Sequence, residues 1–448
     1  MRIAMIGGGY VGLVSGACFA DLGIQVTVVE TDALKLEALR DGRIPIYEPG
    51  LDRLVEDNVA AGRLNFTEDL PAAVSGVEAV FIAVGTPTRR GDGHADVSYV
   101  NAAAEQVARA LTGYAVVVTK STVPVGTGRR IKQIMRHARP DLDFDVASNP
   151  EFLREGSAIG DFMRPDRVVI GAESERAREV LRRLYRPLYL IEAPILFTTL
   201  ETAELTKYAA NSFLAMKVTF INEMADLCER VGADVQDVAR GIGLDGRIGR
   251  KFLHAGPGFG GSCFPKDTLA LMRIAQDWGA PSRLVEATVA VNDARKSTMA
   301  ARITQACGGS VHGKTIAVLG LTFKPETDDM RDAPSLPIVS RLAEEGAVIR
   351  AFDPVGMAHA KGLLPAAVQF CTDAYDAASG ADVLVLVTEW NEFRALSPTR
   401  LGELMQGRLV MDLRNVFEPA AFREAGFDYR GIGRGLPVAQ EQKQKAAE

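Results

Sequence analysis

The sequence predicts an α/β protein with two doubly wound parallel-sheet domains joined by a central long-helix segment. Three observations support this fold class. Short apolar runs alternate with helical patterns in the first third of the chain, as in βαβ units around a parallel sheet. Residues 201–231 contain no proline or glycine and repeat apolar residues at intervals of three and four, which is typical of one long helix. The last third of the chain returns to alternating strand and helix patterns.

The predicted strands of the first third are short and apolar, and each precedes a turn or a helical pattern. They cover residues 2–7, 25–30, 79–85, 115–120 and 145–148. Connections between such strands are right-handed, which places helices on the faces of the sheet. We expect a first domain at 1–197 and a central helical segment at 198–300, followed by a second sheet domain at 301–435 and a flexible tail at 436–448.

The second sheet domain is predicted because its strands repeat those of the first. Thr315–Gly320 resembles Arg2–Gly7 in its apolar pattern. Residues 346–353 likewise resemble residues 23–30, and residues 381–390 resemble residues 78–87. A segment at 308–315 also matches the pattern G-x-x-x-x-G-K-[ST]. It lies after a predicted helix and before a predicted strand, the reverse of the order that a phosphate loop needs, so we interpret it as a turn.

The composition is that of an ordinary globular protein and sets limits on function. At about 100–200 residues per domain, 448 residues correspond to roughly two to four domains. Hydrophobic residues make up 47% of the chain and charged residues 24%, which excludes a disordered or fibrous chain. The net charge of −6 argues against nucleic acid binding through bulk charge. No apolar run approaches the roughly 18 residues that cross a bilayer, so we expect a cytoplasmic protein without membrane insertion.

The cysteines and histidines give no sign of metal or disulfide chemistry. The five cysteines are an odd number without a C-x-x-C pair, and the five histidines lack the H-E-x-x-H spacing. We therefore expect no metal site, and a reducing compartment fits the cysteine pattern.

A glycine triplet predicts that the first domain is a Rossmann-like, NAD-binding domain. Gly7, Gly9 and Gly12 lie between the first strand and a helix, where they permit a tight turn and a close approach of the pyrophosphate to the helix N-terminus. The second strand ends at Glu30, which would bind a ribose 2′-hydroxyl and repel a 2′-phosphate, so NAD is favoured over NADP. Gly320 in the second domain starts no such triplet, and we expect no dinucleotide there.

Cys263 is the strongest candidate for a nucleophile. It follows a loop in which four of the six residues at 256–261 are glycine, so the backbone can pack closely against a ligand. Pro265 fits the first turn of a helix, and both the helix N-terminus and Lys266 favour a thiolate at Cys263. A thiolate can trap an aldehyde covalently. The other four cysteines lie in apolar contexts typical of small buried side chains.

Several polar residues near the predicted strands and helices are weaker candidates. Asp267 could act as a base or orient water, or could simply complement the helix dipole. Lys207 and Asn211 lie four residues apart and so share one face of the long helix, which could be a site or a solvated surface. Thr122, Glu151 and Glu155 follow predicted strands, where α/β proteins bind ligands; turn and cap roles are the alternative. The residues alone leave these alternatives open.

Segments along the chain resemble one family in order from residue 1 to about 435. They are GGGYVG (7–12), GRIPIYEPGL (42–51), FIAVGTP (81–87), STVPVGT (121–127), NPEFLREG (149–156), KYAANSFLAMKVTFINE (207–223), GPGFGGSCFPKD (256–267) and GLTFKPETDDMRDAPS (320–335). These segments resemble the UDP-glucose/GDP-mannose dehydrogenase family. The resemblance implies oxidation of the C6 alcohol of a nucleotide sugar to a carboxylate with two NAD, and the segments YEPGL (47–51) and KFLHAGPGFGG (251–261) favour UDP-glucose.

The resemblance also implies roles for individual residues. Cys263 would form a thiohemiacetal and then a thioester. Lys207 and Asn211 would stabilise the oxyanion. Asp267 would act as a base and position the hydrolytic water, with Thr122 and Glu151 around that water. The implied cofactor contacts beside the glycine triplet are Val11, Glu30, Lys35, Thr86, Ser121, Glu155, Lys266 and Arg331. The implied substrate contacts are Glu151, Phe152, Leu153, Arg154, Glu155, Lys207, Asn211, Phe252, Leu253, His254, Ala255, Gly256, Gly260, Lys324 and Arg414, with Arg247 from the partner subunit of a homodimer or a larger homo-oligomer.

Other functions compete with this interpretation. Within the family, the substrate could be GDP-mannose or a UDP-N-acetylhexosamine. Outside it, the chain could be an NAD-binding redox sensor with Cys263 as an oxidisable switch, or a one-step 3-hydroxyacid dehydrogenase. The number of NADH molecules formed per substrate separates these hypotheses.

Overall fold

The computed structural model describes residues 1–89 and 91–435, so the predicted tail at 436–448 lies outside the described residues. The chain divides into two compact units. The first unit contains residues 1–210 and 269–281, and the second contains residues 211–268 and the described residues from 282 onward. Among the described residues, no helix is long and apolar enough to cross a membrane.

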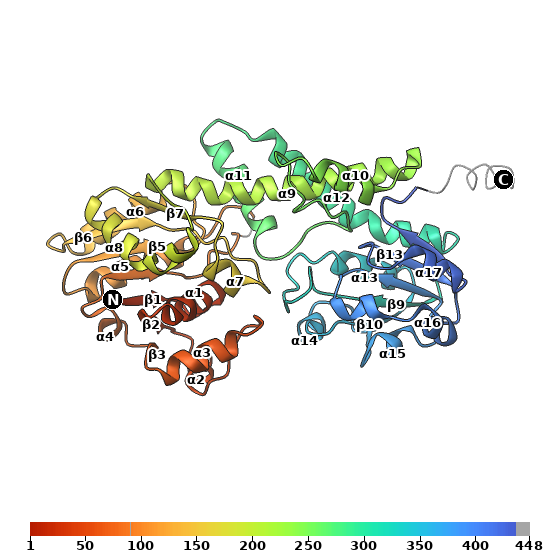
Figure 1. Cartoon of the computed structure of the whole chain (residues 1–448), viewed down its shortest axis with the longest axis horizontal. Helices are drawn as coiled ribbons and strands as arrows, with labels where there is room; N and C mark the ends of the chain where they lie inside the picture. The colour runs from red at the N-terminus through yellow and green to blue at the C-terminus, as the bar shows by residue number, and fades with distance from the viewer. Residues whose placement is uncertain (90, 436–448) are drawn as a thin grey trace. The chain divides into compact units, whose positions relative to one another are not determined.

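The described residues of the first unit form an eight-stranded sheet in the order β3-β2-β1-β4-β5-β6-β7-β8 (Figure 1). Its strands are β1 (Arg2–Ile6), β2 (Gln25–Val29), β3 (Leu64–Thr67), β4 (Ala79–Ile82), β5 (Ala115–Thr119), β6 (Phe144–Ser148), β7 (Val168–Ala172) and β8 (Ile195–Thr198). The predicted strands are confirmed. Sequence analysis missed β3, β7 and β8, and β7 pairs with β6 in the antiparallel direction, so this sheet is not fully parallel.

Helices cover both faces of this sheet because alternate strand residues point to opposite sides. Ile3 and Met5 of β1 pack in one cluster with Leu13 of α1 (Tyr10–Asp21), while Ala4 packs on the other face with Val107 of α5 (Ser98–Ala110). The remaining helices are α2 (Ala33–Arg40), α3 (Leu51–Ala60), α4 (Leu70–Val74), α6 (Thr127–Ala138), α7 (Ala158–Met163), α8 (Glu175–Tyr185) and the short 3₁₀ segment η1 (Arg186–Ile191).

The predicted long helix is confirmed as α9 (Leu200–Val231), a single helix of 32 residues. It is followed by α10 (Val235–Gly243), α11 (Phe264–Asp277) and α12 (Arg283–Ala306). The boundary between the two units falls within α9 after Ala210 and within α11 after Thr268.

In the second unit, the described strands form a parallel sheet in the order β11-β10-β9-β12-β13-β14 (Figure 1). The strands are β9 (Thr315–Leu319), β10 (Val348–Phe352), β11 (Gln369–Phe370), β12 (Val383–Leu386), β13 (Leu409–Asp412) and β14 (Asp428–Gly431). The helices are α13 (Ser335–Glu344), α14 (Met357–Ala360), α15 (Ala374–Ala378), α16 (Pro398–Leu404) and α17 (Pro419–Glu424), with the 3₁₀ segment η2 (Asn391–Ala395). The predicted repeat of the first sheet is therefore confirmed. The segment at 308–315 joins α12 to β9, which confirms that it lacks the strand–loop–helix order of a phosphate loop.

Candidate active site

The glycine triplet forms a tight turn that is closely packed at Gly7 and Gly12 and open at Gly9. Gly7 has φ +107°, and a Cβ there would lie 2.7 Å from the carbonyl oxygen of Ala83. A Cβ on Gly12 would lie 1.9 Å from the carbonyl oxygen of Gly7, so this position is closed to any side chain. Gly9, in contrast, has open space around it and precedes the first residue of α1. This backbone can approach a phosphate at the helix N-terminus, and it fits NAD.

Glu30 lies directly after β2, as predicted for the residue that binds the ribose. Its Oε2 accepts a hydrogen bond from the Gly8 N–H at 3.0 Å, which joins the acid to the glycine turn. Nearby, the Ser121 hydroxyl donates to the Val84 carbonyl at 2.7 Å, and this bond ties the end of β5 to the end of β4. Thr86 is buried and Val11 is half-buried, whereas Lys35 lies exposed on α2.

The second unit carries an acid, Asp353, at the position that corresponds to Glu30. Asp353 is fully buried, and its two oxygens accept hydrogen bonds from the backbone N–H groups of Leu321, Thr322, Val355 and Gly356 and from the indole N–H of Trp390. These bonds close the turns after β9 and β10. Both oxygens of the Asp353 carboxylate therefore accept hydrogen bonds from groups of its own sheet domain.

Lys207 and Glu151 form a buried ion pair in the first unit. The Lys207 Nζ lies 3.1 Å from Glu151 Oε1, and the two residues are 2% and 6% exposed. The same ammonium lies 5.3 Å from the centre of the Phe152 ring. Glu151 Oε2 also accepts a hydrogen bond from the Leu153 N–H at 2.5 Å, so the loop after β6 is held around this carboxylate. Of the two alternatives for Lys207, the solvated surface is excluded.

Lys120 is a second buried lysine in this unit, and sequence analysis did not single it out. Its Nζ donates to Asn149 Oδ1 at 3.1 Å and to the Tyr185 hydroxyl at 3.2 Å. Burial lowers the pKa of Lys120 to about 8, although the Glu151 carboxylate acts in the opposite direction. Its position directly before Ser121, at the end of an apolar strand, was the available signal.

Glu204, one helical turn before Lys207 on α9, was also missed. Its carboxylate accepts hydrogen bonds from the N–H groups of Gly126 and Gly128 at 2.6 and 2.7 Å, at the start of α6. The Ser148 hydroxyl donates to the same carboxylate at 3.2 Å. Burial raises the pKa of Glu204 to about 7, although these N–H donors favour the charged form. Glu204 therefore fixes this turn of α9 on α6 and β6.

Glu48 gives a structural role to the 42–51 segment. The Tyr10 hydroxyl donates to the buried Glu48 carboxylate, which also accepts bonds from the N–H groups of Gly156 and Ala158 at 2.6 and 2.7 Å. Burial, reinforced by the Glu48 carboxylate, raises the pKa of Tyr10. Because Tyr10 is the first residue of α1 and Gly156 follows Glu155, this contact joins the glycine turn to the segment at 151–155.

Cys263 lies directly before α11 in the second unit, and Pro265 occupies the first turn of that helix, as predicted. Cys263 is partly exposed, and its carbonyl oxygen accepts the Asp267 N–H at 2.8 Å. The Asp267 side chain is fully buried; its Oδ2 accepts a bond from Asn211 Nδ2 at 2.6 Å and its Oδ1 one from Lys266 Nζ at 2.5 Å. Asp267 and Asn211 are therefore brought together one turn after the thiol. The burial of Asn211 excludes its surface alternative.

The other cysteines have different surroundings. Cys18, Cys228 and Cys371 are buried and Cys307 is half-buried. Burial raises the pKa of all four thiols, that of Cys18 to about 12. They fit the interpretation of packed thiols that stay protonated.

The glycine-rich loop at 256–261 packs closely against the rest of the second unit. A Cβ on Gly260 would lie 2.3 Å from the Asp332 carbonyl oxygen, and one on Gly261 would lie 2.6 Å from the Phe323 ring. A Cβ on Gly256 would lie 2.9 Å from the guanidinium of Arg414, so the structure brings this predicted substrate contact to the loop. The Gly261 N–H also donates to the Arg331 carbonyl at 2.7 Å.

The remaining predicted site residues are more dispersed. Phe252 has φ +65°, an uncommon conformation for a bulky residue that marks a strained turn before the glycine loop. Arg154 pairs with Asp161, and Arg247 pairs with Asp245 while its side chain is 89% exposed. The burial of the others is as follows: Leu253 and Ala255 are buried, Thr122, Leu153, Glu155 and Lys324 are half-buried, and His254 is exposed. In the part of the chain that the structure describes, no group of three His, Cys, Asp or Glu residues could hold a metal ion.

Comparison with protein-family models gives a match in each third of the chain. Residues 1–189 match the NAD binding domain of the UDP-glucose/GDP-mannose dehydrogenase family, residues 201–294 match its central domain, and residues 317–419 match its UDP binding domain. The NAD binding match contains the glycine triplet and Glu30. The matched central domain contains Lys207, Asn211 and Cys263.

Individual relatives and solved structures agree with this result. The chain is 61% identical over 436 residues to the UDP-glucose 6-dehydrogenase of Rhizobium meliloti, covering 97% of this chain and 100% of that protein. It is 48% identical to UDP-glucose 6-dehydrogenase TuaD of Bacillus subtilis, covering 97% and 93%. The structure of a UDP-glucose dehydrogenase from Pyrobaculum islandicum superposes with a TM-score of 0.89 at 39% identity, covering 97% of this chain and 98% of that one.

Proposed function

The chain belongs to the UDP-glucose/GDP-mannose dehydrogenase family, and on this premise we propose that it oxidises UDP-glucose at C6 to UDP-glucuronate. The names of the relatives, which are 61% and 48% identical over nearly the whole chain, support UDP-glucose as the substrate. The observation that carries the chemistry is the buried Asp267–Asn211 pair one turn after a partly exposed cysteine at a helix N-terminus.

Bound NAD supplies the hydride acceptor, and two equivalents are consumed because alcohol to carboxylate is a four-electron oxidation. We assign its pyrophosphate to the turn formed by Gly7, Gly9 and Gly12 and its ribose to Glu30. The other cofactor contacts that we propose are Val11, Lys35, Thr86, Ser121, Glu155, Lys266 and Arg331. The domains assigned to the cofactor, to the central helices and to the UDP-sugar are 1–197, 198–300 and 301–435.

Cys263 is the proposed nucleophile. After the first oxidation removes two electrons and two protons from the C6 alcohol, the thiolate adds to the aldehyde carbon and forms a thiohemiacetal. The second two-electron oxidation converts this adduct to a thioester. Water then breaks the C–S bond, which gives the carboxylate and returns Cys263 as a thiol. A one-step alcohol dehydrogenase needs no such thiol.

Lys207 and Asn211 lie one helical turn apart on α9, and we propose that both donate to the oxyanion on C6. Asp267 would accept a proton and orient the hydrolytic water, assisted by Thr122 and Glu151. The substrate contacts that we propose are Glu151, Phe152, Leu153, Arg154, Glu155, Phe252, Leu253, His254, Ala255, Gly256, Gly260, Lys324 and Arg414, with Arg247 reaching the sugar of the partner subunit.

We also propose that the protein is a homodimer through α9. Phe213, Phe220 and Leu227 are 58%, 46% and 50% exposed and recur every seven residues, so they form one apolar stripe. At about 100° per residue this stripe lies nearly opposite Asn211 on the helix. Covering it with a second copy would bury apolar surface without blocking Asn211. Light scattering of the purified protein tests the dimer: twice the chain mass supports it, and a monomer at micromolar concentration contradicts it.

The test of the reaction counts NADH formed from limiting UDP-glucose and excess NAD. Two NADH per sugar are expected, with none from GDP-mannose. One NADH would contradict the thioester route and favour a one-step dehydrogenase. If UDP-glucose gives no NADH but GDP-mannose or a UDP-N-acetylhexosamine gives two, that nucleotide sugar is the substrate. NAD binding without any turnover would favour the redox sensor.

The covalent step is tested separately with Cys263→Ser. This variant should bind NAD as the wild type does and make no carboxylate at a measurable steady-state rate, because a serine hydroxyl is a far weaker nucleophile than a thiolate. Cys307→Ser, which changes another thiol that is not fully buried, is the matched control and should retain activity. Undiminished UDP-glucuronate production by Cys263→Ser would eliminate the covalent mechanism.

A further inference from the structure

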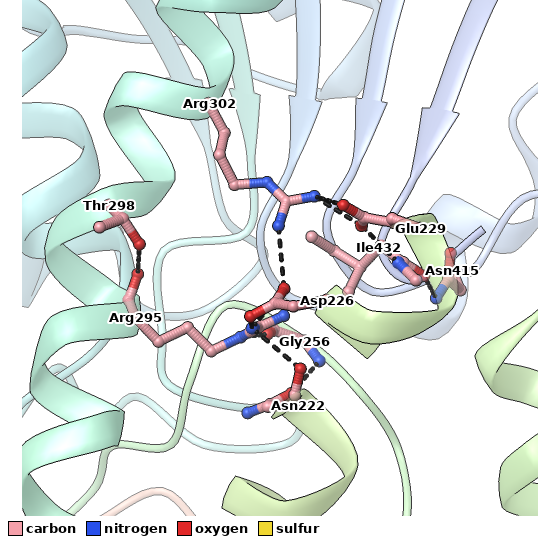
Figure 2. A network of polar contacts seen from close by, with 10 residues as sticks. Asn222, Asp226, Glu229, Gly256, Arg295, Thr298, Arg302, Asn415 and Ile432 are labelled. Carbon is pink, nitrogen blue, oxygen red and sulfur yellow. Dashed lines mark hydrogen bonds and ion pairs between the residues drawn. The ribbon is translucent and has the colours of Figure 1, made fainter. Parts of the chain in front are cut away.

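Both backbone groups of Gly256, at the start of the cysteine loop, are bound by buried side chains. The Gly256 N–H donates to Asn222 Oδ1 at 2.8 Å, and Arg295 Nε donates to the Gly256 carbonyl at 2.6 Å (Figure 2). Asn222 comes from α9 and Arg295 from α12. This end of the loop is therefore fixed from two helices.

The same arrangement recurs at Phe259, four residues before Cys263. The Phe259 N–H donates to Asn292 Oδ1 at 2.8 Å, and Asn292 Nδ2 donates to the Phe259 carbonyl at 3.1 Å. One asparagine amide thus binds the N–H and the C=O of a single loop residue. Asn292 lies one helical turn before Arg295 on α12, so the two residues act from one face of that helix.

Arg295 is itself held by a chain of ion pairs, which Figure 2 shows. Its Nη1 lies 2.9 Å from both oxygens of Asp226 and also donates to the Asn222 carbonyl at 3.1 Å. Asp226 is bound in turn by Arg302 at 3.1 Å, and Arg302 makes two bonds of 2.6 and 2.7 Å to Glu229. The guanidinium of Arg295 therefore has little freedom to leave Gly256.

The loop itself cannot supply this rigidity. Four of the six residues at 256–261 are glycine, and Gly258 has φ +120°, a conformation that glycine adopts at no steric cost. Such a segment loses much conformational entropy when it is ordered, and buried contacts must compensate for that loss. Asn222, Asn292 and Arg295 are 1%, 3% and 5% exposed, and their hydrogen bonds to the loop backbone are buried, so these bonds are costly to leave unmade.

We propose that Asn222, Asn292 and Arg295 are positioning residues that hold the cysteine loop. Asn292 sets the location of the Cys263 thiol through Phe259, and Asn222 and Arg295 set the location of the substrate contact Gly256. This inference rests on the proposed role of Cys263 as the nucleophile. A displacement of about 1 Å in a reacting group can cost about 100-fold in rate, so small shifts of the loop are sufficient to impair turnover.

The two ends of the loop predict different kinetic effects. Asn292 acts near Cys263, so Asn292→Ala should lower kcat by about 30- to 100-fold while KM for UDP-glucose changes less than about threefold. Asn222 and Arg295 act at Gly256, which is among the proposed substrate contacts. Asn222→Ala and Arg295→Lys should therefore raise KM by about tenfold or more and have the smaller effect on kcat. Asn222→Asp keeps an acceptor for the Gly256 N–H and should restore the wild-type KM within about threefold.

Asn58→Ala is the matched control for a loss of stability alone. Asn58 is fully buried in the first unit, donates to the Leu54 carbonyl at 2.8 Å and accepts a bond from Arg63 at 2.9 Å. Its loss should lower the unfolding temperature by a similar amount as Asn292→Ala but leave kcat and KM unchanged. If Asn292→Ala also keeps the wild-type kcat, or if every variant shows the same proportional loss, the positioning role is wrong.

A second measurement separates this inference from the proposed mechanism. Alkylation of Cys263 by iodoacetamide, mapped by mass spectrometry across pH 6–10, requires no turnover. Asn292→Ala should shift the pH profile of this reaction, which is measured without NAD or substrate. An unchanged alkylation profile would overturn the positioning role. Full activity of Cys263→Ser would overturn the mechanism and leave the alkylation result as a test of the loop contacts alone.

Discussion

Glu204 should make the protein less stable as pH rises through neutrality. Burial raises the pKa of this glutamate from about 4.5 to about 7. A group whose folded-state pKa is raised stabilises the fold fully below the unfolded-state value and loses that contribution as pH rises through the folded-state value. At about 1.4 kcal/mol for each tenfold change in proton affinity, the difference corresponds to about 3 kcal/mol, most of it between pH 5 and 8.

Urea denaturation from pH 5 to 8, followed by circular dichroism, measures this effect as the difference between wild type and Glu204→Gln. The variant loses an acceptor for the N–H groups of Gly126 and Gly128, so its absolute stability will fall at every pH. Its stability should not show the additional decline with pH, because glutamine does not titrate. The free energy difference between the two proteins should therefore shrink by 2–3 kcal/mol, roughly, between pH 5 and 8.

Glu201→Gln is the control for this experiment. Glu201 lies on the same turn of α9, but its own backbone N–H and Arg129 hold its pKa below the usual value. The contribution of Glu201 to the free energy of unfolding is lost only as the pH falls below the pKa of an ordinary carboxyl group. This contribution is therefore constant between pH 5 and 8. Parallel pH curves for wild type and Glu204→Gln would show that the carboxylate is ionised in the fold and would refute the reasoning.

The remaining predictions concern the glycine turn and the Tyr10–Glu48 contact. Gly12→Ala should abolish detectable NAD binding in calorimetry, because the new Cβ would lie 1.9 Å from the Gly7 carbonyl oxygen; retained affinity would mean that the turn can open. Tyr10→Phe should increase amide hydrogen exchange at residues 151–158, because the variant removes the hydroxyl that donates to the Glu48 carboxylate, and this carboxylate binds the N–H groups of Gly156 and Ala158. The control is Tyr114→Phe, which removes a comparable hydroxyl–carboxylate bond of 2.9 Å and should leave that segment unchanged. Equal exchange in both variants would show that the Tyr10 contact does not order the segment.

The sequence was sufficient to predict the features that depend on local pattern. The long helix has apolar spacing along its whole length, and the strands that bracket the glycine triplet are apolar runs next to turns. Cys263 was recognisable because glycines precede it and Pro265 follows it in the helix. Each of these signals lies in residues that are continuous in the sequence, which is why it can be recognised without tertiary information.

The missed features depend on contacts between distant parts of the chain. Asn222 binds Gly256 across 34 residues and Asn292 binds Phe259 across 33, and no spacing rule links them. Asn222 does share a helix face with Asn211, because 11 residues are close to three turns, and this was an available signal. The antiparallel direction of β7 and β8 relative to β6 could not be predicted either, because an apolar strand has the same composition in either direction.

The absence of a glycine triplet from the second sheet domain has a practical consequence. Asp353 lies at the position that corresponds to Glu30, but Gly320 starts no triplet that could receive a pyrophosphate at a helix N-terminus. An NAD titration should therefore saturate at one equivalent per chain. With the chain concentration known independently, the end point of that titration would give the fraction of intact cofactor sites in any preparation.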